Sequence, residues 1–346
     1  MKKSISAFLL SIGGFAFGLI ASLLLARMAG ESPIQVLKII LNSAFGSKYD
    51  LGLTLFYTTH FLFTGLSVSI AFQSGLFNIG AEGQLTVATM AAAITGILIP
   101  TWPFPLGVIA CLASAIFAGA LWGFIPGYLQ SKRGAHEVIV TMMLNFVAAG
   151  LTSYLTLNFF KNPESQNPET AAVGAGSMMT AFDPVAKYFS DSPANFSLLV
   201  GIALCGIYYV LMNKTIWGYE LKAVGQNEVA SKTAGINVAK NKILAMTLAG
   251  AFAGFVALNE ISGSAGKFKM GFSADYGFVG IAVALMSNTN PLGILATSFL
   301  FGVLQKGTLD LSLDSQFITK DFARIMQAVI ILGVVGSSYF RRDIKK

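Results

Sequence analysis

Residues 276–307 read YGFVGIAVALMSNTNPLGILATSFLFGVLQKG, and Lys306 is the single charged residue among them. A membrane-spanning helix needs roughly 20 mostly apolar residues, so this stretch is long enough for one tilted helix or for two short ones. The central Asn288-Thr289-Asn290-Pro291 favours a turn, because proline removes a helical hydrogen bond and asparagine adopts turn conformations readily. We therefore expect two helices, at 276–288 and 291–307, with a break between them.

The same apolar character extends over the whole chain. Of its 346 residues, 54% are hydrophobic and 11% are charged, whereas a soluble domain carries about 25% charged residues. So few charges cannot cover a soluble protein of this size, but a surface that faces lipid needs none. The sequence predicts an all-α integral membrane protein, a single transmembrane domain over 1–346 with about ten transmembrane helices, some short or broken. The expected spans are approximately 5–27, 51–72, 84–99, 105–129, 138–158, 196–213, 243–261, 276–288, 291–307 and 323–340.

Positive charge is concentrated in four segments. They are Lys2–Lys3, Lys132–Arg133, the loop 214–242, and the tail with Arg341, Arg342, Lys345 and Lys346. These segments hold 13 basic and three acidic residues. The segments between them hold ten basic and ten acidic residues, not counting three glutamates that lie at helix ends or within spans. Since Lys and Arg accumulate in short cytoplasmic loops, we expect both termini to be cytoplasmic, which requires an even number of spans. The polar connection 159–195 is then an outer loop with a small amount of local structure.

Glycines recur at helical spacing in several predicted spans. The sets are Gly14 and Gly18, then Gly119, Gly123 and Gly127, then Gly250 and Gly254. Small residues at this spacing let membrane helices approach each other closely. We favour packing within the chain over an interface between subunits.

The connection Gly75–Gln84, GLFNIGAEGQ, is the most unusual in the chain because it combines three glycines with Asn, Glu and Gln between two apolar spans. Non-helical backbone at membrane depth is tolerated where it lines a cavity, and an ionisable group there is a functional candidate. The alternative is a cytoplasmic turn with Glu82 in solvent or capping a helix. Our candidate residues for a solute pathway are Phe77, Asn78, Glu82, Gln84 and Asn145.

Other polar residues within the spans have ordinary structural explanations. We expect His60 to be hydrogen-bonded packing, and Asn145 and Asn259 either to bond neighbouring helices or to offer amides to a solute. Glu137 opens a helix, where a carboxylate interacts favourably with the helix dipole. The run Gly263–Lys267 lacks the spacing and the Ser/Thr of a phosphate-binding loop, so it predicts no ATP site.

The loop around 219–238 is predicted to contain a short amphipathic helix at 227–234. Gly235 follows it, and glycine is a frequent residue just after a helix end. A compact helix of this kind can dock into a groove of a partner, although a surface helix without a partner has the same pattern.

Several segments of the chain resemble permease subunits of bacterial ABC importers. They are Phe77–Gln84, Ala135–Ile139 and Gly225–Val238, with Gly277–Met286 and Asn290–Gly293 similar as well. The resemblance extends over about residues 50–340, and FNIGAEGQ at 77–84 is its most specific part. More narrowly, the chain resembles nucleoside permeases that work with a Bmp-type solute-binding lipoprotein. Their broader group also carries ribose-type sugars and branched-chain amino acids.

This resemblance implies a transport subunit in the bacterial plasma (inner) membrane, without an ATPase site or cofactor of its own. Its implied partners are an ABC ATPase, a second related permease in a heterodimer, and an extracytoplasmic solute-binding lipoprotein. The loop 214–242 would couple ATP hydrolysis to transport, through residues Asn227, Glu228, Val229, Ala230, Ser231, Ala234 and Gly235. The family pattern there is Glu-Ala-Ala with a glycine six residues after the Glu. This chain has Val229-Ala230-Ser231 and Gly235, with its glutamate at 228 instead of 229. The resemblance therefore implies that the segment docks on the ATPase, but it does not imply an ion pair formed by the family's glutamate.

The expected solute is small and neutral, most simply a nucleoside, because the spans offer no Arg or Lys cluster for a phosphate or carboxylate. A simple sugar or a branched-chain amino acid is the alternative within the same class. A competing class is an ion-coupled secondary transporter that uses Glu82, Glu137 or Glu260. We find no metal-ligand cluster and no nucleophile–base pair for a membrane enzyme, and no basic face for nucleic acid.

Overall fold

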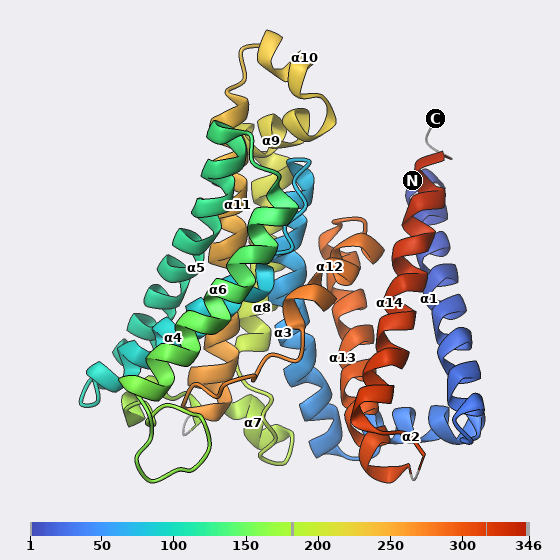
Figure 1. Ribbon diagram of the computed structural model, residues 1–346, viewed down its shortest axis with the longest axis vertical. Helices are drawn as coiled ribbons and strands as arrows, with labels where there is room; N and C mark the ends of the chain where they lie inside the picture. The colour runs from blue at the N-terminus through green and yellow to red at the C-terminus, as the bar shows by residue number, and fades with distance from the viewer. Residues whose placement is uncertain (1, 181–182, 316, 344–346) are drawn as a thin grey trace.

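A computed structural model describes residues 2–180, 183–315 and 317–343, and these residues are almost entirely helical (Figure 1). The helices are α1 (Lys2–Met28), α2 (Pro33–Phe45), α3 (Lys48–Gln73), α4 (Ala81–Leu98), α5 (Leu106–Arg133), α6 (Glu137–Asn158), α7 (Pro184–Tyr188), α8 (Ser197–Lys214), α9 (Ile216–Gln226), α10 (Glu228–Thr233), α11 (Val238–Gly254), α12 (Tyr276–Met286), α13 (Pro291–Asp314) and α14 (Lys320–Asp343). A 3-10 turn, η1 (Ala175–Ser177), and a π-helical segment, η3 (Leu258–Ala265), complete the set. The prediction of an all-α membrane protein is confirmed.

The predicted break within 276–307 is confirmed. α12 ends at Met286 and α13 begins at Pro291, the first residue of its helix. Between them, Asn288 and Thr289 both adopt left-handed backbone, with φ of 52° and 56°. The Asn290 side chain accepts hydrogen bonds from the amides of Leu292 (3.0 Å) and Gly293 (3.3 Å), which fixes the start of α13.

Each of the ten expected spans lies on a helix, but fewer helices are long and apolar enough to cross a membrane. In the described residues seven qualify, and α1 with α2 adds an eighth if this pair, bent by 117°, is counted as one span. α12 has 11 residues, which at 1.5 Å per residue covers only about half of the hydrocarbon core. Thus 276–307 holds one short apolar helix and one span, and not two spans. α14, whose side chains are described only as far as Ser337, is not among the seven.

α3 is the central helix of the bundle. In its most apolar window 83% of the residues are buried, whereas the corresponding shares for α6 and α5 are 17% and 28%. The outward faces of these two helices carry exposed apolar side chains such as Phe117 and Phe146. Such faces are stable only against lipid, so α5 and α6 lie at the periphery and α3 in the protein interior.

The glycine pattern of α5 and α11 serves packing within the chain, as expected. A Cβ on Gly250 would collide with the carbonyl oxygen of Gly119, and a Cβ on Gly123 with that of Met246. Gly254 similarly packs against the backbone at Ala115. The two helices therefore cross in direct backbone contact, which the small-residue spacing permits.

The two ends of the bundle differ in character (Figure 1). α1 begins and α14 ends at the end that carries α9 and α10, while α2 and α7 lie at the opposite end. Within its described residues the connection 159–195 contains η1, α7 and an isolated β-bridge between Lys161 and Thr170. It is tied to the segment after η3 by the ion pair Glu169–Lys267 (2.8 Å), and the hydrogen bond from Lys267 lowers the pKa of Glu169 below its usual value.

Candidate functional site

The connection between α3 and α4 is held by a pair of buried amides. The Asn78 and Gln84 side chains donate to each other's oxygens, at 3.0 and 3.3 Å. Asn78 Oδ1 also accepts from the amide of Gly80 at 3.1 Å. Both side chains are buried and are mutually satisfied, so they stabilise the irregular backbone before α4.

Glu82 joins two helices that are far apart in the sequence. It lies in the first turn of α4, and its Oε2 accepts a hydrogen bond from the amide of Gly277, in the first turn of α12, at 2.7 Å. A Cβ on Gly277 would collide with the backbone of Glu82, so only glycine permits this approach. Two helix N-termini, each a partial positive charge, thus meet at one carboxylate. Glu82 caps a helix, as one sequence interpretation expected, but the helix is α12.

Asn145 and Phe77 complete the predicted pathway set. Asn145, on α6, accepts from the amide of Gly83 (2.9 Å) and donates to the carbonyl of Ile79 (3.1 Å), so it bonds α6 to the α3–α4 connection. Phe77 is 37% exposed and stacks on Phe72, with ring centroids 5.2 Å apart. The structure therefore brings Asn78, Glu82, Gln84 and Asn145 together around one connection.

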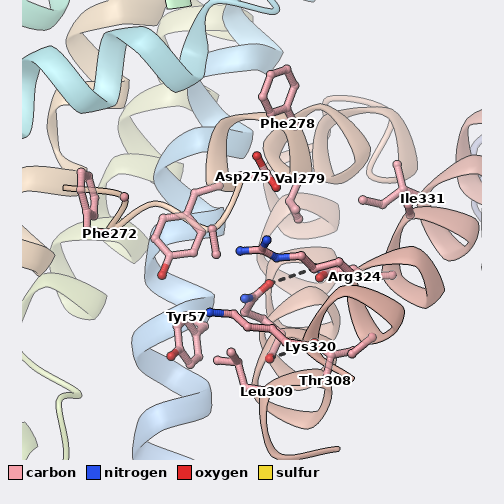
Figure 2. Close-up of a pocket in the computed structure, with 17 residues that line it drawn as sticks. Tyr57, Phe272, Asp275, Phe278, Val279, Thr308, Leu309, Lys320, Arg324 and Ile331 are labelled. Atoms are coloured by element: carbon pink, nitrogen blue, oxygen red, sulfur yellow. Dashed lines mark hydrogen bonds between the residues drawn. The ribbon is translucent and has the colours of Figure 1, made fainter. Parts of the chain in front are cut away.

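A cavity of about 460 Å³ lies between α3, α12, α13 and α14 (Figure 2). None of the five predicted pathway residues lines it. Its aromatic wall consists of Tyr57, Phe272, Tyr276 and Phe278. Its volume falls within the range of small-molecule sites, roughly 300–1,000 Å³, and its mixture of aromatic and polar groups is typical of them.

Polar groups line the rest of this cavity. Gln327 on α14 donates to Gln305 on α13 at 3.0 Å, and both amides are buried. Lys320 and Arg324, one turn apart on α14, reach into the cavity toward Tyr57 and α12 (Figure 2). No pair of cations was expected within the spans, because Lys320 precedes the expected span 323–340 and only the helical turn aligns it with Arg324.

The missed cavity residues come from segments that lie far apart in the chain. Tyr57, Asp275, Gln305 and Gln327 belong to α3, the start of α12, α13 and α14. The features of the sequence that could have indicated this cavity were isolated amide side chains in apolar helices and the Asp275-Tyr276 pair before an apolar run. None of these features has a characteristic spacing. A second cavity, of about 510 Å³, lies by the α12–α13 turn near α8 and α9, with Tyr208 and Lys222 in its lining.

A buried polar network adjoins the cavity. His60 on α3 lies 3.2 Å from the Glu260 carboxylate, and its ring centroid is 4.5 Å from that of Tyr276. Asn259, next to Glu260 in η3, donates to the carbonyl of Phe56 at 3.0 Å. His60 and Asn259 thus bond neighbouring helices, as expected for polar residues at this depth. Segments of π-helix are rare and occur frequently at functional sites.

The predicted helix at 227–234 is observed as α10. The Asn227 side chain caps it by accepting from the amide of Ala230 at 3.0 Å, and the Ser231 hydroxyl bonds back to the Asn227 carbonyl at 2.8 Å. The helix ends at Thr233 with Ala234 as its C-cap, and Gly235 adopts left-handed backbone, with φ of 85°. Glycine has no steric penalty there, which explains the sharp stop.

α10 is attached to α11 through an ion pair. Glu228, the first residue of α10, pairs with Lys242, whose side chain is only 6% exposed. Val229, the next residue, is 76% exposed. A groove of about 840 Å³ lies beside the helix and includes Gln130 and Ser131 from the end of α5. α10 therefore exposes Val229 together with the polar residues Lys232 and Thr233, while its acidic residue is paired with Lys242 of its own chain.

These features define the class of protein. A helical membrane bundle with a broken helix at the edge of a polar cavity is typical of the membrane subunit of a transporter. The family described as branched-chain amino acid transport system / permease component matches residues 51–335. The chain belongs to this family. It is thus an ABC importer permease, a non-catalytic multi-pass subunit of the cytoplasmic membrane, and its family works with an ATPase and a solute-binding protein.

Relatives with assigned solutes are similar over most of their length. The guanosine ABC transporter permease NupP of Bacillus subtilis is 34% identical over 98% of this chain and 96% of its own. The nucleoside ABC transporter permease NupB of Lactococcus lactis is 30% identical, covering 96% and 91%. A glucose ABC transporter permease of Haloferax volcanii is 29% identical, covering 90% and 82%. Bacillus subtilis also has a second guanosine permease, NupQ, which is 26% identical over 73% of this chain and 79% of its own.

A solved structure supports the fold. The chain of an ABC transporter in an inward-facing conformation aligns with a TM-score of 0.50 at 16% identity. The alignment covers 92% of this chain and 98% of that one. At this identity the likeness concerns the fold alone.

The Glu82–Gly277 joint generates a direct prediction. Replacing Glu82 with Gln keeps a hydrogen-bond acceptor but removes the charge that two helix N-termini face. Since hydrogen bonds to charged groups contribute about 1.5–3 kcal/mol, we expect solute uptake in proteoliposomes to fall by roughly tenfold or more. The matched control is Glu137→Gln, because Glu137 also lies in the first turn of a helix, α6. We expect near-normal uptake by this variant. Equal uptake by the two variants would show that the Glu82 charge does not support the transport path.

Proposed function

We propose that this permease carries nucleosides into the cell, and that the cavity between α3, α12, α13 and α14 receives the solute. The observation that supports this most strongly is the lining of the cavity. Tyr57, Phe272 and Phe278 supply aromatic surface on which a nucleobase can stack, and base–aromatic stacking contributes about 1–3 kcal/mol per base. The similarity to NupP and NupB supports the same solute class.

The charges of the cavity also suit a neutral solute. Lys320 and Arg324 are accompanied by two carboxylates, Asp275 in the lining and Asp321, 3.8 Å from Arg324. Charges of both signs favour neither an anion nor a cation strongly, whereas their donors and acceptors can all bond a polyhydroxylated molecule. A simple sugar has the same hydrogen-bonding groups, and the glucose permease relative makes it the second candidate.

We further propose that the end with α9 and α10 is cytoplasmic and that α10 receives the movement of the ATPase. Several basic segments support this orientation, because α1 begins, α5 ends and α14 ends at the same end as α10. Lys345 and Lys346 of the tail lie outside the described residues. The exposed Val229 and the groove beside it offer a docking surface, and the Glu228–Lys242 pair links that surface to α11.

Energy then enters at one end of the bundle and acts on a cavity within it. α11 leads from α10 into η3, whose Glu260 lies against His60 and thus next to Tyr276 of the cavity. Alternating access requires that the outward- and inward-facing states bind the solute differently, and ATP hydrolysed by a separate subunit shifts their populations. The partner permease is a second, related chain, as the NupP and NupQ pair suggests.

The coupling role of α10 can be tested by charge exchange. In Glu228→Lys two ammonium groups face each other, so α10 should detach from α11. Because the pair is partly exposed and contributes about 1 kcal/mol, we expect solute-stimulated ATP hydrolysis to fall roughly fivefold. The combined exchange, Glu228→Lys with Lys242→Glu, recreates the pair with reversed signs and should restore most of the loss. An unchanged rate in the single variant, or no recovery in the double one, contradicts the link.

The solute can be assigned by competition in the reconstituted complex. Uptake of labelled guanosine should require ATP and the ATPase subunit, and unlabelled uridine or adenosine should compete. Ribose, glucose and leucine should compete poorly, because they lack the base that stacks in the cavity. Guanosine 5′-monophosphate tests whether Lys320 and Arg324 favour an anion. If glucose competes more strongly than the nucleosides, the chain is a sugar permease. If labelled guanosine enters without the ATPase subunit, the chain is a secondary transporter.

A further inference from the structure

Asp275 occupies the N-cap position of α12 but does not cap the helix. Its backbone is left-handed, with φ of 62° and ψ of 31°, and its side chain accepts no hydrogen bond from the first turn. An aspartate at this position ordinarily turns its carboxylate onto the first amides of the helix. A residue other than glycine in left-handed backbone is uncommon, and such strain is often found at functional sites.

Glu82 takes the capping role that Asp275 leaves. The amide of Gly277, two residues after Asp275, donates to Glu82 Oε2 at 2.7 Å. The first turn of α12 is therefore satisfied by a carboxylate from another helix. This arrangement leaves both oxygens of Asp275 available for a different partner.

The Asp275 side chain lines the cavity (Figure 2). It is exposed, and among the described residues it makes no hydrogen bond or ion pair. Lys320 and Arg324 reach into the same space from α14, so the cavity does not favour a cationic ligand. No group of three or more His, Cys, Asp or Glu side chains that could hold a metal occurs in the described part of the chain. A neutral hydrogen-bond donor is the partner that remains.

We infer that Asp275 binds the vicinal diol of the solute, two hydroxyl groups on adjacent carbons. A carboxylate offers two acceptor oxygens, and hydrogen bonds to a charged acceptor are the strong ones. Carboxylates bind ribose hydroxyls in the same way in dinucleotide-binding proteins. The inference rests on the proposed function and names the part of the solute that is recognised. The 2′- and 3′-hydroxyls of a ribonucleoside form such a diol, and so do adjacent hydroxyls of glucose.

Competition with deoxy analogues tests this role. Guanosine, 2′-deoxyguanosine and 3′-deoxyguanosine compete for uptake of labelled guanosine by the reconstituted complex, with the same binding protein throughout. We expect the wild type to prefer guanosine over either deoxy analogue by roughly tenfold or more, because each analogue leaves a charged acceptor without one donor. In Asp275→Asn this preference should fall to less than about threefold. Because the binding protein is constant, a changed preference arises in the permease.

Two further variants separate recognition from folding. Asp275→Gly fits left-handed backbone without strain and removes the carboxylate, so it should lose the preference as Asp275→Asn does. Asp191→Asn is the matched control, because Asp191 is also exposed and left-handed, with φ of 56°, but lies outside the cavity. It should keep the wild-type preference. A preference that persists in both Asp275 variants overturns the inference.

The remaining outcomes distinguish the solute classes. Glucose and 2-deoxyglucose form the parallel arm. One outcome is that the complex transports glucose, with a wild-type preference for glucose over 2-deoxyglucose that disappears in Asp275→Asn. In that case the diol inference holds while the nucleoside proposal fails. If the wild type transports guanosine but does not distinguish it from its deoxy analogues, the nucleoside proposal holds while the diol inference fails.

Discussion

One carboxylate lies at the start of two helices. Glu82 lies in the first turn of α4 and accepts the amide of Gly277 in α12, so the partial positive charges of both helix N-termini are compensated at one place. In a bilayer, unsatisfied backbone groups cost several kcal/mol each, and this joint lets α12 begin inside the bundle. Because Glu82 bonds the first turn of α12, the Asp275 side chain beside the cavity is not needed as a helix cap.

Several other charged and polar groups inside the bundle are likewise satisfied by nearby partners. His60 is bonded to Phe56 and Glu260, and the Lys306 side chain lies 3.4 Å from Asp50 and also pairs with Asp310. The cavity groups Asp275, Lys320 and Arg324 differ from these, because they are exposed to an open space rather than enclosed by partners. Groups that a fold leaves accessible at this depth are the ones that a solute can use.

The sequence predicts local features of this fold better than its long-range contacts. The break at 288–291 and the helix after Asn227 each depend on residues within one short segment, and both were predicted. The glycine spacing predicted close packing within the chain, but not that the glycines of α5 meet those of α11. The cavity was not, because its walls come from four helices between Tyr57 and Ile331. The partner of Glu82 lies 195 residues away, and no local pattern identifies it. The predicted pathway residues Asn78, Gln84 and Asn145 cluster around one connection, and their part in transport stays a prediction.

Photolabelling tests most directly whether the cavity between α3, α12, α13 and α14 receives the solute. A photoreactive guanosine analogue is cross-linked to the complete complex, and the labelled peptides are identified by mass spectrometry. We expect labelling within 271–279 and 305–331, suppressed by excess guanosine. Guanosine-sensitive labelling confined to 286–296 and 208–222, around the second cavity, would contradict the assignment.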